Sequence, residues 1–147
     1  MIDFEIVDYK SSDFTQLIEL WELTGLGNAA RGDDNKIIEH SINIGGKLLV
    51  MKKTGSNQMI GCSWMTTDGR RLYIHHFGIH PDFQGLGLSK PLMEATMNFA
   101  KKLGQQVKLE VHAENTRAIN LYKKYDFKYL GDYHVYINRE IQILSNC

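Results

Sequence analysis

The sequence has few of the features that would assign it to a special class of protein. It contains no run of roughly 18 apolar residues, and its start, MIDFEIVDYK, lacks the basic and apolar segments of a signal peptide. With 2 prolines and 13 glycines among 147 residues, it is not a collagen-like or disordered chain. Its 2 cysteines, Cys62 and Cys147, form neither a disulfide framework nor a metal motif. These absences predict a cytoplasmic, reduced globular protein, with Cys62 as a small core residue.

Net charge of either sign is also missing, because 17 basic side chains balance 17 acidic ones. A sum of zero argues against a dedicated nucleic-acid or membrane-surface binder. The charge is nevertheless polarised: residues 1–40 hold 9 acidic and 3 basic side chains, a balance of −6, so the remainder carries +6. We therefore expect one end of the molecule to meet an anion, while the other end is suited to a cation.

A length of 147 residues fits a single domain, 1–147, without a linker or an internal repeat. Apolar periodicity and turn residues predict helices near 14–24, 34–44, 90–103 and 116–125. Alternating or continuous apolar runs, divided by turn residues, predict the strands. These expected strands are 4–7, 48–51, 59–65, 72–79, 107–111, 127–130 and 135–141. The order of elements predicts an α/β fold with a mixed sheet packed by helices.

The segment most informative about chemistry is Ile74–Lys90, IHHFGIHPDFQGLGLSK. A strand that runs through a glycine loop into a helix directs backbone N–H groups at an anion, so phosphate binding is the first hypothesis. Two phosphate motifs fail on spacing. A dinucleotide fingerprint needs a third glycine where Lys90 stands, and Leu48 follows Lys47 where a P-loop needs Ser or Thr.

Two motifs do match a known family. The loop Gln84-Gly85-Leu86-Gly87-Leu88-Ser89 resembles the acetyl-CoA pyrophosphate loop of the GCN5-related N-acetyltransferases (GNAT), and Leu109–Asn115 followed by Tyr122 and Phe127 resembles their later motif. The resemblance covers residues 72–130 and departs at Ser89 and Asp126, where Gly or Ala and Gly are usual. It implies a mixed, mostly antiparallel sheet of about six or seven strands, splayed at the coenzyme site and flanked by about four helices.

The resemblance also implies which residues hold acetyl-CoA. The loop would bind the pyrophosphate, with Lys90 as an extra charge, while the strand end would bind the pantetheine arm, with Gly78 marking a bulge. Asn115 would contact pantetheine through its amide. Its residue type is also typical of a helix N-cap, which is the alternative role. The implied coenzyme-binding residues are Phe77, Gly78, Ile79, Gln84, Gly85, Leu86, Gly87, Leu88, Ser89, Lys90, Asn115 and Tyr122.

Acetyl transfer to an amine needs a proton donor and a proton acceptor. Tyr122 lies seven residues after Asn115 on the same helix face, and its phenol can protonate a departing thiolate. Three positions compete as proton acceptor, with a water chain as the alternative: Glu110, by its position in Leu-Glu-Val, and the neighbours His76 and His75. Alternation along the strand predicts that the two histidines point to opposite faces, so only one of them can face the substrate, and His76 is the candidate of the two. A metal is not expected, because His76 and His80 would lie ~13 Å apart on an extended strand.

The acceptor molecule is the least determined part of the prediction. We expect direct attack by a primary amine on acetyl-CoA in a ternary complex, and the acidic pair Asp33–Asp34 favours a cationic amine unless it is only a solvated surface. A protein N-terminus, as in the ribosomal-protein N-terminal acetyltransferases, is an alternative acceptor. A non-catalytic acyl-CoA sensor is the alternative of another class. A homodimer is left open.

Overall fold

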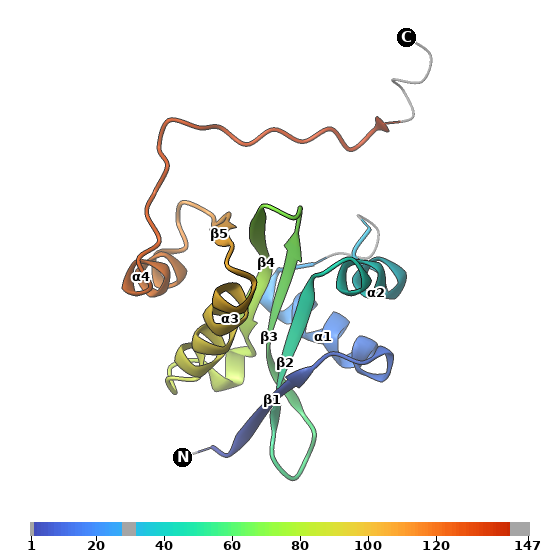
Figure 1. Ribbon diagram of the computed structural model, residues 1–147. Coiled ribbons are helices and arrows are strands. Elements are labelled where there is room, and N and C mark those ends of the chain that lie inside the picture. Colours follow the sequence, from blue (N-terminus) through green and yellow to red (C-terminus); the bar gives the residue numbers. More distant parts are fainter. Residues whose placement is uncertain (1, 28–31, 142–147) are drawn as a thin grey trace. The chain divides into compact units, whose positions relative to one another are not determined.

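The computed structural model describes residues 2–27 and 32–141, and the chain divides into two units, residues 1–110 and 111–147 (Figure 1). Cys147 lies outside the described residues. The helices and strands of the first unit are β1 (Phe4–Asp8), η1 (Ser11–Asp13), α1 (Phe14–Thr24), α2 (Asn35–Asn43), β2 (Lys47–Lys53), β3 (Met59–Thr67), β4 (Arg71–Ile79), η3 (Pro81–Phe83), α3 (Ser89–Leu103) and β5 (Gln106–Leu109). The second unit contains α4 (Thr116–Lys124).

The sheet of the first unit follows the chain, in the order β1-β2-β3-β4-β5. Strands β1 to β4 pair antiparallel with their neighbours, whereas β5 pairs parallel to β4. The parallel step follows from the α3 crossover, because a helix is the usual connection between parallel neighbours. The α/β fold and its mixed, mostly antiparallel sheet are confirmed; residues 2–27 and 32–141 contain five strands, where about six or seven were predicted.

Alternation along β3 assigns the helices of the first unit to the two faces of its sheet. Trp64 stacks on Trp21 of α1, with ring centroids 5.6 Å apart, and its indole N–H donates to Ser41 of α2. Ser63, the neighbouring residue on β3, instead hydrogen-bonds Thr96 of α3. Helices α1 and α2 therefore cover one face and α3 covers the other (Figure 1).

The apolar core between the sheet and helices α1 and α2 contains Cys62, which is fully buried as predicted. Its buried members are Tyr9, Leu17, Leu20, Trp21, Ile38, Leu48, Val50, Met59, Cys62 and Trp64. Burial raises the pKa of the Cys62 thiol to about 12, so this group is an inert part of the core.

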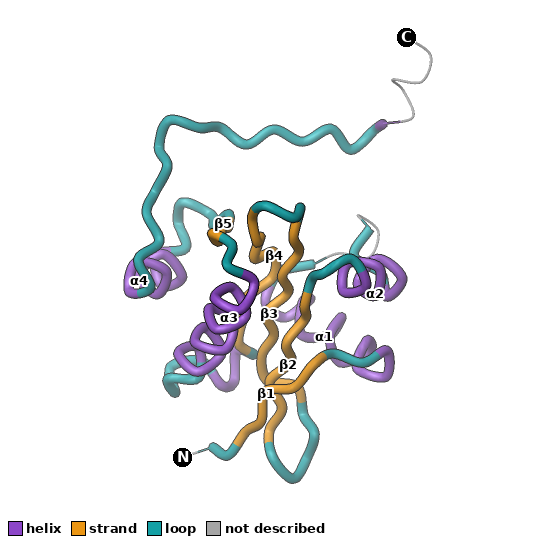
Figure 2. The backbone as a smooth tube through the Cα atoms, viewed as in Figure 1, coloured by secondary structure: helices purple, strands orange, loops and turns teal. Residues whose placement is uncertain are grey.

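The two predicted final strands, 127–130 and 135–141, are absent: the structure has loops and turns through residues 127–140 (Figure 2). A strand needs a hydrogen-bonded neighbour, and in the described part of this segment the backbone hydrogen bonds are local ones, from Phe127 N to Tyr122 O and from Tyr133 N to Leu130 O. Alternation of apolar residues was a valid signal for extended chain, but it does not provide that neighbour. The segment leaves its large apolar side chains exposed, among them Tyr129 and Tyr136.

Candidate active site

The glycine loop before α3 has the backbone conformation that an anion site needs. Gly85 and Gly87 adopt φ values of +79° and +77°, which side-chain-bearing residues rarely take. The Gln84 side chain donates to the carbonyl oxygen of Ile79 at 3.0 Å, which fixes the loop to the end of β4. Leu88 is buried, and α3 begins at Ser89. The loop therefore presents glycine backbone at a helix N-terminus, an arrangement that fits a pyrophosphate.

Strand β4 has an open edge beside this loop. Its pairing with β5 covers Arg71 to Ile74, and the described part of the first unit has no strand paired to residues 75–79 on that side. On the other side Phe77, Gly78 and Ile79 pair in continuous register with β3. The backbone groups along the open edge can accept an extended ligand as an added strand would be accepted. This arrangement fits the predicted pantetheine position.

The predicted bulge lies at a different residue. Gly78 pairs regularly with Cys62, so the prediction of a bulge at Gly78 is wrong. The register instead shifts between Trp64↔His76 and Met65↔Ile74, which makes His75 the extra residue on β4. A Cβ at Gly78 would come within 2.9 Å of Leu26 Cδ1, so a larger residue there would require the Leu26 side chain to shift.

The bulge also overturns the expectation that His75 and His76 point to opposite faces. Both imidazoles contact the Trp64 ring, with centroid distances of 5.7 Å for His75 and 5.3 Å for His76. Simple alternation fails here because two residues of β4 share one partner on β3. His76 also lies edge-on to Trp21, at 4.7 Å.

His76 has an acceptor oxygen at each ring nitrogen. Nδ1 lies 2.8 Å from the backbone oxygen of His75, and Nε2 lies 3.2 Å from Asp33 Oδ2. The side chains of His76 and Asp33 are 17% and 24% exposed. In the sequence Asp33 stands out only as half of the acidic pair Asp33–Asp34, because a contact across 43 residues leaves no local signal.

His75 has a different environment. Its Nε2 lies 2.5 Å from Thr66 Oγ1, and its ring stacks against Tyr73 at 6.2 Å. Although the side chain is partly exposed, burial lowers its pKa below the usual value, and His76 lowers it further, while Asp33 and Glu110 act in the opposite direction. The predicted acceptor Glu110 follows β5 in the first unit and is exposed.

Asn115 and Tyr122 lie on the second unit. The Asn115 side chain caps α4 by accepting from Ala118 N at 3.2 Å, as its residue type predicts. Tyr122 is 8% exposed, its ring packs edge-on against Phe127 at 5.7 Å, and burial raises the pKa of its phenol. Asp126, one of the two departures from the family pattern, has a left-handed φ of +64°, the conformation that a glycine usually supplies.

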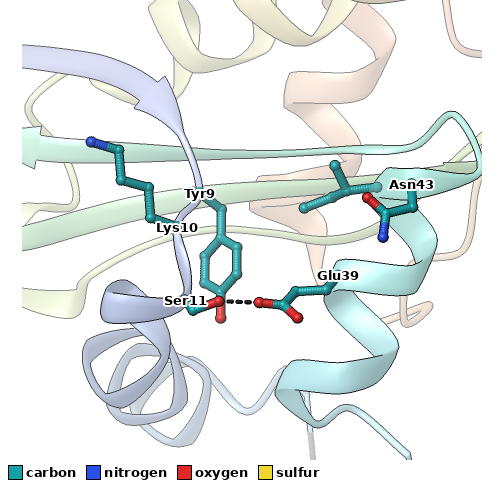
Figure 3. Close-up of a pocket in the computed structure, with 6 residues that line it drawn as sticks. Tyr9, Lys10, Ser11, Glu39 and Asn43 are labelled. Carbon is teal, nitrogen blue, oxygen red and sulfur yellow. Dashed lines mark hydrogen bonds between the residues drawn. The ribbon is translucent and has the colours of Figure 1, made fainter.

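A separate cavity of about 400 Å³ lies in the first unit between the segment around η1 and helix α2 (Figure 3). Its lining residues are Tyr9, Lys10, Ser11, Glu39, Ile42 and Asn43. Ser11 donates to Glu39 there, and burial together with Glu39 and Asp13 raises the pKa of Tyr9 to about 12. No predicted site residue lines this cavity. Among the described residues there is no group of three His, Cys, Asp or Glu that could hold a metal ion, and no helix long and apolar enough to cross a membrane.

Comparison with known proteins identifies the family. The sequence profile of the Acetyltransferase (GNAT) family matches residues 14–127. The chain belongs to this family. GNAT acetyltransferases use acetyl-CoA and act on an amine, so the predicted acetyltransferase activity is confirmed at the level of the family.

Similar GNAT proteins extend over most of the chain. An acetyltransferase of Yersinia enterocolitica is 29% identical over 128 residues, which are 84% of this chain and 87% of that protein. A solved acetyltransferase from Streptococcus agalactiae has a TM-score of 0.78 at 21% identity, with 92% of this chain and 91% of that one covered. The ribosomal-protein-S18-alanine N-acetyltransferase from Escherichia coli has a TM-score of 0.69 at 18% identity. The superposed region includes 86% of this chain and 78% of the Escherichia coli chain. These structures share the fold.

Proposed function

We propose that this GNAT acetyltransferase transfers the acetyl group of acetyl-CoA to a primary amine by direct attack in a ternary complex. The observation that carries the proposal is the open edge of β4 directly before the glycine loop of α3. One ligand with an extended amide-containing arm and a pyrophosphate suits both features, and family membership makes acetyl-CoA that ligand. Acetyl-CoA supplies the thioester that the amine attacks.

Each residue of the proposed site has a defined task. Backbone N–H groups of Gln84–Ser89 hold the pyrophosphate, with the Lys90 ammonium beside them, and the backbone of Phe77–Ile79 pairs with the pantetheine arm and donates to the developing oxyanion. Asn115 contacts pantetheine. Tyr122 protonates the departing sulfur, for which a phenol kept neutral by burial is suited. Glu110 and His76 are the predicted proton acceptors.

The structure weakens the argument that the acidic pair Asp33–Asp34 attracts a cationic acceptor. The Asp33 carboxylate already lies beside His76, and Asp34 caps α2 by accepting from Ile37 N at 2.9 Å. Neither carboxylate is simply a free surface charge. The acceptor is therefore proposed as a primary amine, with polyamines, amino sugars, lysine side chains and protein N-termini as the classes to test.

A matched pair of glycine variants tests the proposed coenzyme loop. Gly87 and Gly55 both have positive φ, +77° and +89°, and both have open space where a Cβ would stand. Alanine at either position should therefore cost about 1 kcal/mol of folding stability from backbone strain alone. Gly55 lies in the turn between β2 and β3, so it serves as the control.

The measurement is the affinity for acetyl-CoA by isothermal calorimetry, with thermal melting to report stability. Gly87→Ala should weaken binding about tenfold or more, because the strained loop no longer presents its N–H groups to the pyrophosphate, while Gly55→Ala should bind as the wild type does. Equal affinities of the two variants for acetyl-CoA would show that the loop does not bind the coenzyme. A wild-type protein that acetyl-CoA neither binds nor stabilises would overturn the proposed function itself.

A further inference from the structure

The bulge on β4 brings two adjacent histidines to one tryptophan and gives them different surroundings. Because Trp64 of β3 pairs with His76 and the next pairing skips to Ile74, His75 is displaced toward the Trp64 ring together with its neighbour. Two imidazoles of one strand thus share a site. Their hydrogen-bond partners differ, and this difference suits them to different tasks.

Each ring nitrogen of His76 faces an oxygen that can accept a hydrogen bond. The backbone oxygen of His75 can only accept, so the Nδ1 of His76 must donate to it over 2.8 Å. The Nε2 faces a carboxylate oxygen of Asp33 at 3.2 Å, and it too can bond only by donating. When both bonds are made, His76 carries a proton on each nitrogen and has no lone pair with which to accept another. Packing against Trp21 and Trp64 holds the ring in this position.

His75 is arranged to accept a proton. If its Nε2–H donates to Thr66 Oγ1 over 2.5 Å, the lone pair lies on Nδ1, for which the described residues provide no hydrogen-bond partner. The ring is partly exposed, so an acceptor molecule can reach it. Its lowered pKa agrees with a ring that is neutral near pH 7. His75 also stands only two residues before Phe77, ~7 Å along the strand, which one amine and one water can span.

We propose that His75, in place of the predicted acceptors Glu110 and His76, is the catalytic residue that removes the proton from the acceptor amine, and that the Asp33–His76 pair is a positioning element that fixes the bulge. The proposal rests on the proposed acetyl transfer. Of the three N–H protons of an ammonium acceptor, one passes to His75 Nδ1 before attack, one stays in the amide and one reaches the CoA sulfur through Tyr122. The N–C bond forms as the C–S bond breaks, and His75 then releases its proton to water.

The charged and titratable groups around His75 predict how the rate depends on pH. These groups are His76 and Tyr73 on β4, Asp33 before α2, Glu110 after β5 and Lys108 on β5, which lies over the Tyr73 ring. Because the neutral ring is the active form, kcat/KM should rise with pH along a limb below 6.5. Since His76 lowers the pKa of His75 and Glu110 raises it, His76→Gln should move this limb to higher pH, whereas Glu110→Gln should move it to lower pH.

The kinetic test follows CoA release with spermidine, glucosamine, glycyl-leucine and Nα-blocked lysine, and takes the fastest of them through pH 5 to 9. His75→Gln should lose about 100-fold or more in kcat and lose the acidic limb, with little change in the KM for acetyl-CoA. His40→Gln, which removes an exposed imidazole of α2, is the matched control and should keep the wild-type profile. An active wild type whose acidic limb survives in His75→Gln overturns this proposal and leaves the proposed function intact. A wild type inactive with every amine overturns both.

A second readout is independent of turnover. Long-range ¹H–¹⁵N correlation spectra of the folded protein separate a doubly protonated imidazole from a neutral one. We expect a proton on the Nε2 of His76, which faces the Asp33 carboxylate, while the neutral His75 ring carries its proton on the Nε2 that faces Thr66. A His75 ring that is protonated throughout the range in which the enzyme is active, or a His76 ring with a bare Nε2, would overturn the assignment.

Discussion

The hydroxyl pair Ser63–Thr96 makes a quantitative prediction about how α3 is attached to the sheet. Both side chains are completely buried, and their oxygens lie 2.8 Å apart. Thr96 also donates its single hydroxyl proton to the carbonyl oxygen of Leu92 at 2.8 Å. The proton between the two hydroxyls must therefore come from Ser63. The result is a directed chain from β3 through Thr96 to the first turn of the helix that follows the glycine loop.

The direction of this chain makes the two single variants unequal. Thr96→Val keeps the shape of the side chain but leaves the buried Ser63 hydroxyl without an acceptor, which should cost about 1–3 kcal/mol of unfolding free energy. Ser63→Ala leaves the bond from Thr96 to Leu92 in place and should cost about 0.5–1.5 kcal/mol. In the double variant no hydroxyl is left unsatisfied. We therefore expect it to cost less than the sum of the singles, with a coupling of about 1 kcal/mol.

The measurement is urea unfolding followed by far-UV circular dichroism, and 1 kcal/mol corresponds to about 2–4 °C in the melting temperature of a chain of this size. Thr24→Val is the control, because Thr24 donates at 2.7 Å to Leu20 within its own helix and makes no hydrogen bond between elements among those described. It should cost less than about 1 kcal/mol. Additive effects of Ser63→Ala and Thr96→Val, or a larger loss for Ser63→Ala than for Thr96→Val, would refute the directed chain.

Three other predictions concern separate parts of the chain. In Cys147→Ser protein, the Cys62 thiol should react with Ellman's reagent only after unfolding, since burial raises its pKa to about 12; rapid reaction of the native protein would contradict its place in the core. Gly46→Ala should lower the melting temperature strongly or prevent folding, because a Cβ would stand 2.6 Å from two backbone oxygens; a melting temperature equal to that of the wild type would refute this tight contact. Tyr122→Phe should reduce kcat about 100-fold or more while coenzyme affinity changes less than about threefold, and a large loss of affinity instead would give Tyr122 a structural role.

Local signals in the sequence predicted the order of helices and strands in the first unit. The turn at Asp68 and Gly69 and the end of α3 at Gly104 each depend on residues within a few positions of one another. The glycine loop belongs to the same class, since its left-handed backbone is encoded by Gly85 and Gly87 themselves. These features could be predicted because the residues that form them also specify them.

Features that depend on a distant partner were missed or misplaced. The bulge at His75 is defined by where Trp64 pairs, and the partner of His76 is a carboxylate 43 residues earlier, so neither can be seen in the segment Ile74–Lys90. The predicted strands at 127–130 and 135–141 failed for the same reason, because an apolar alternation predicts an extended chain and not the strand that pairs with it. The chemistry of the site changes most at these positions, since the bulge decides which imidazole is available.

The most direct test of the proposed acetyl transfer is a stoichiometric one. The protein is incubated with acetyl-CoA and each amine of the panel, and free CoA and N-acetylated product are both quantified by mass spectrometry at several enzyme concentrations. The account predicts that, for at least one amine, CoA and acetylated amine form in equal amounts, at an initial rate proportional to enzyme, and that Tyr122→Phe slows both together. CoA release that is the same with and without every amine, or binding of acetyl-CoA with no acetylated product, would contradict acetyl transfer and indicate an acyl-CoA sensor.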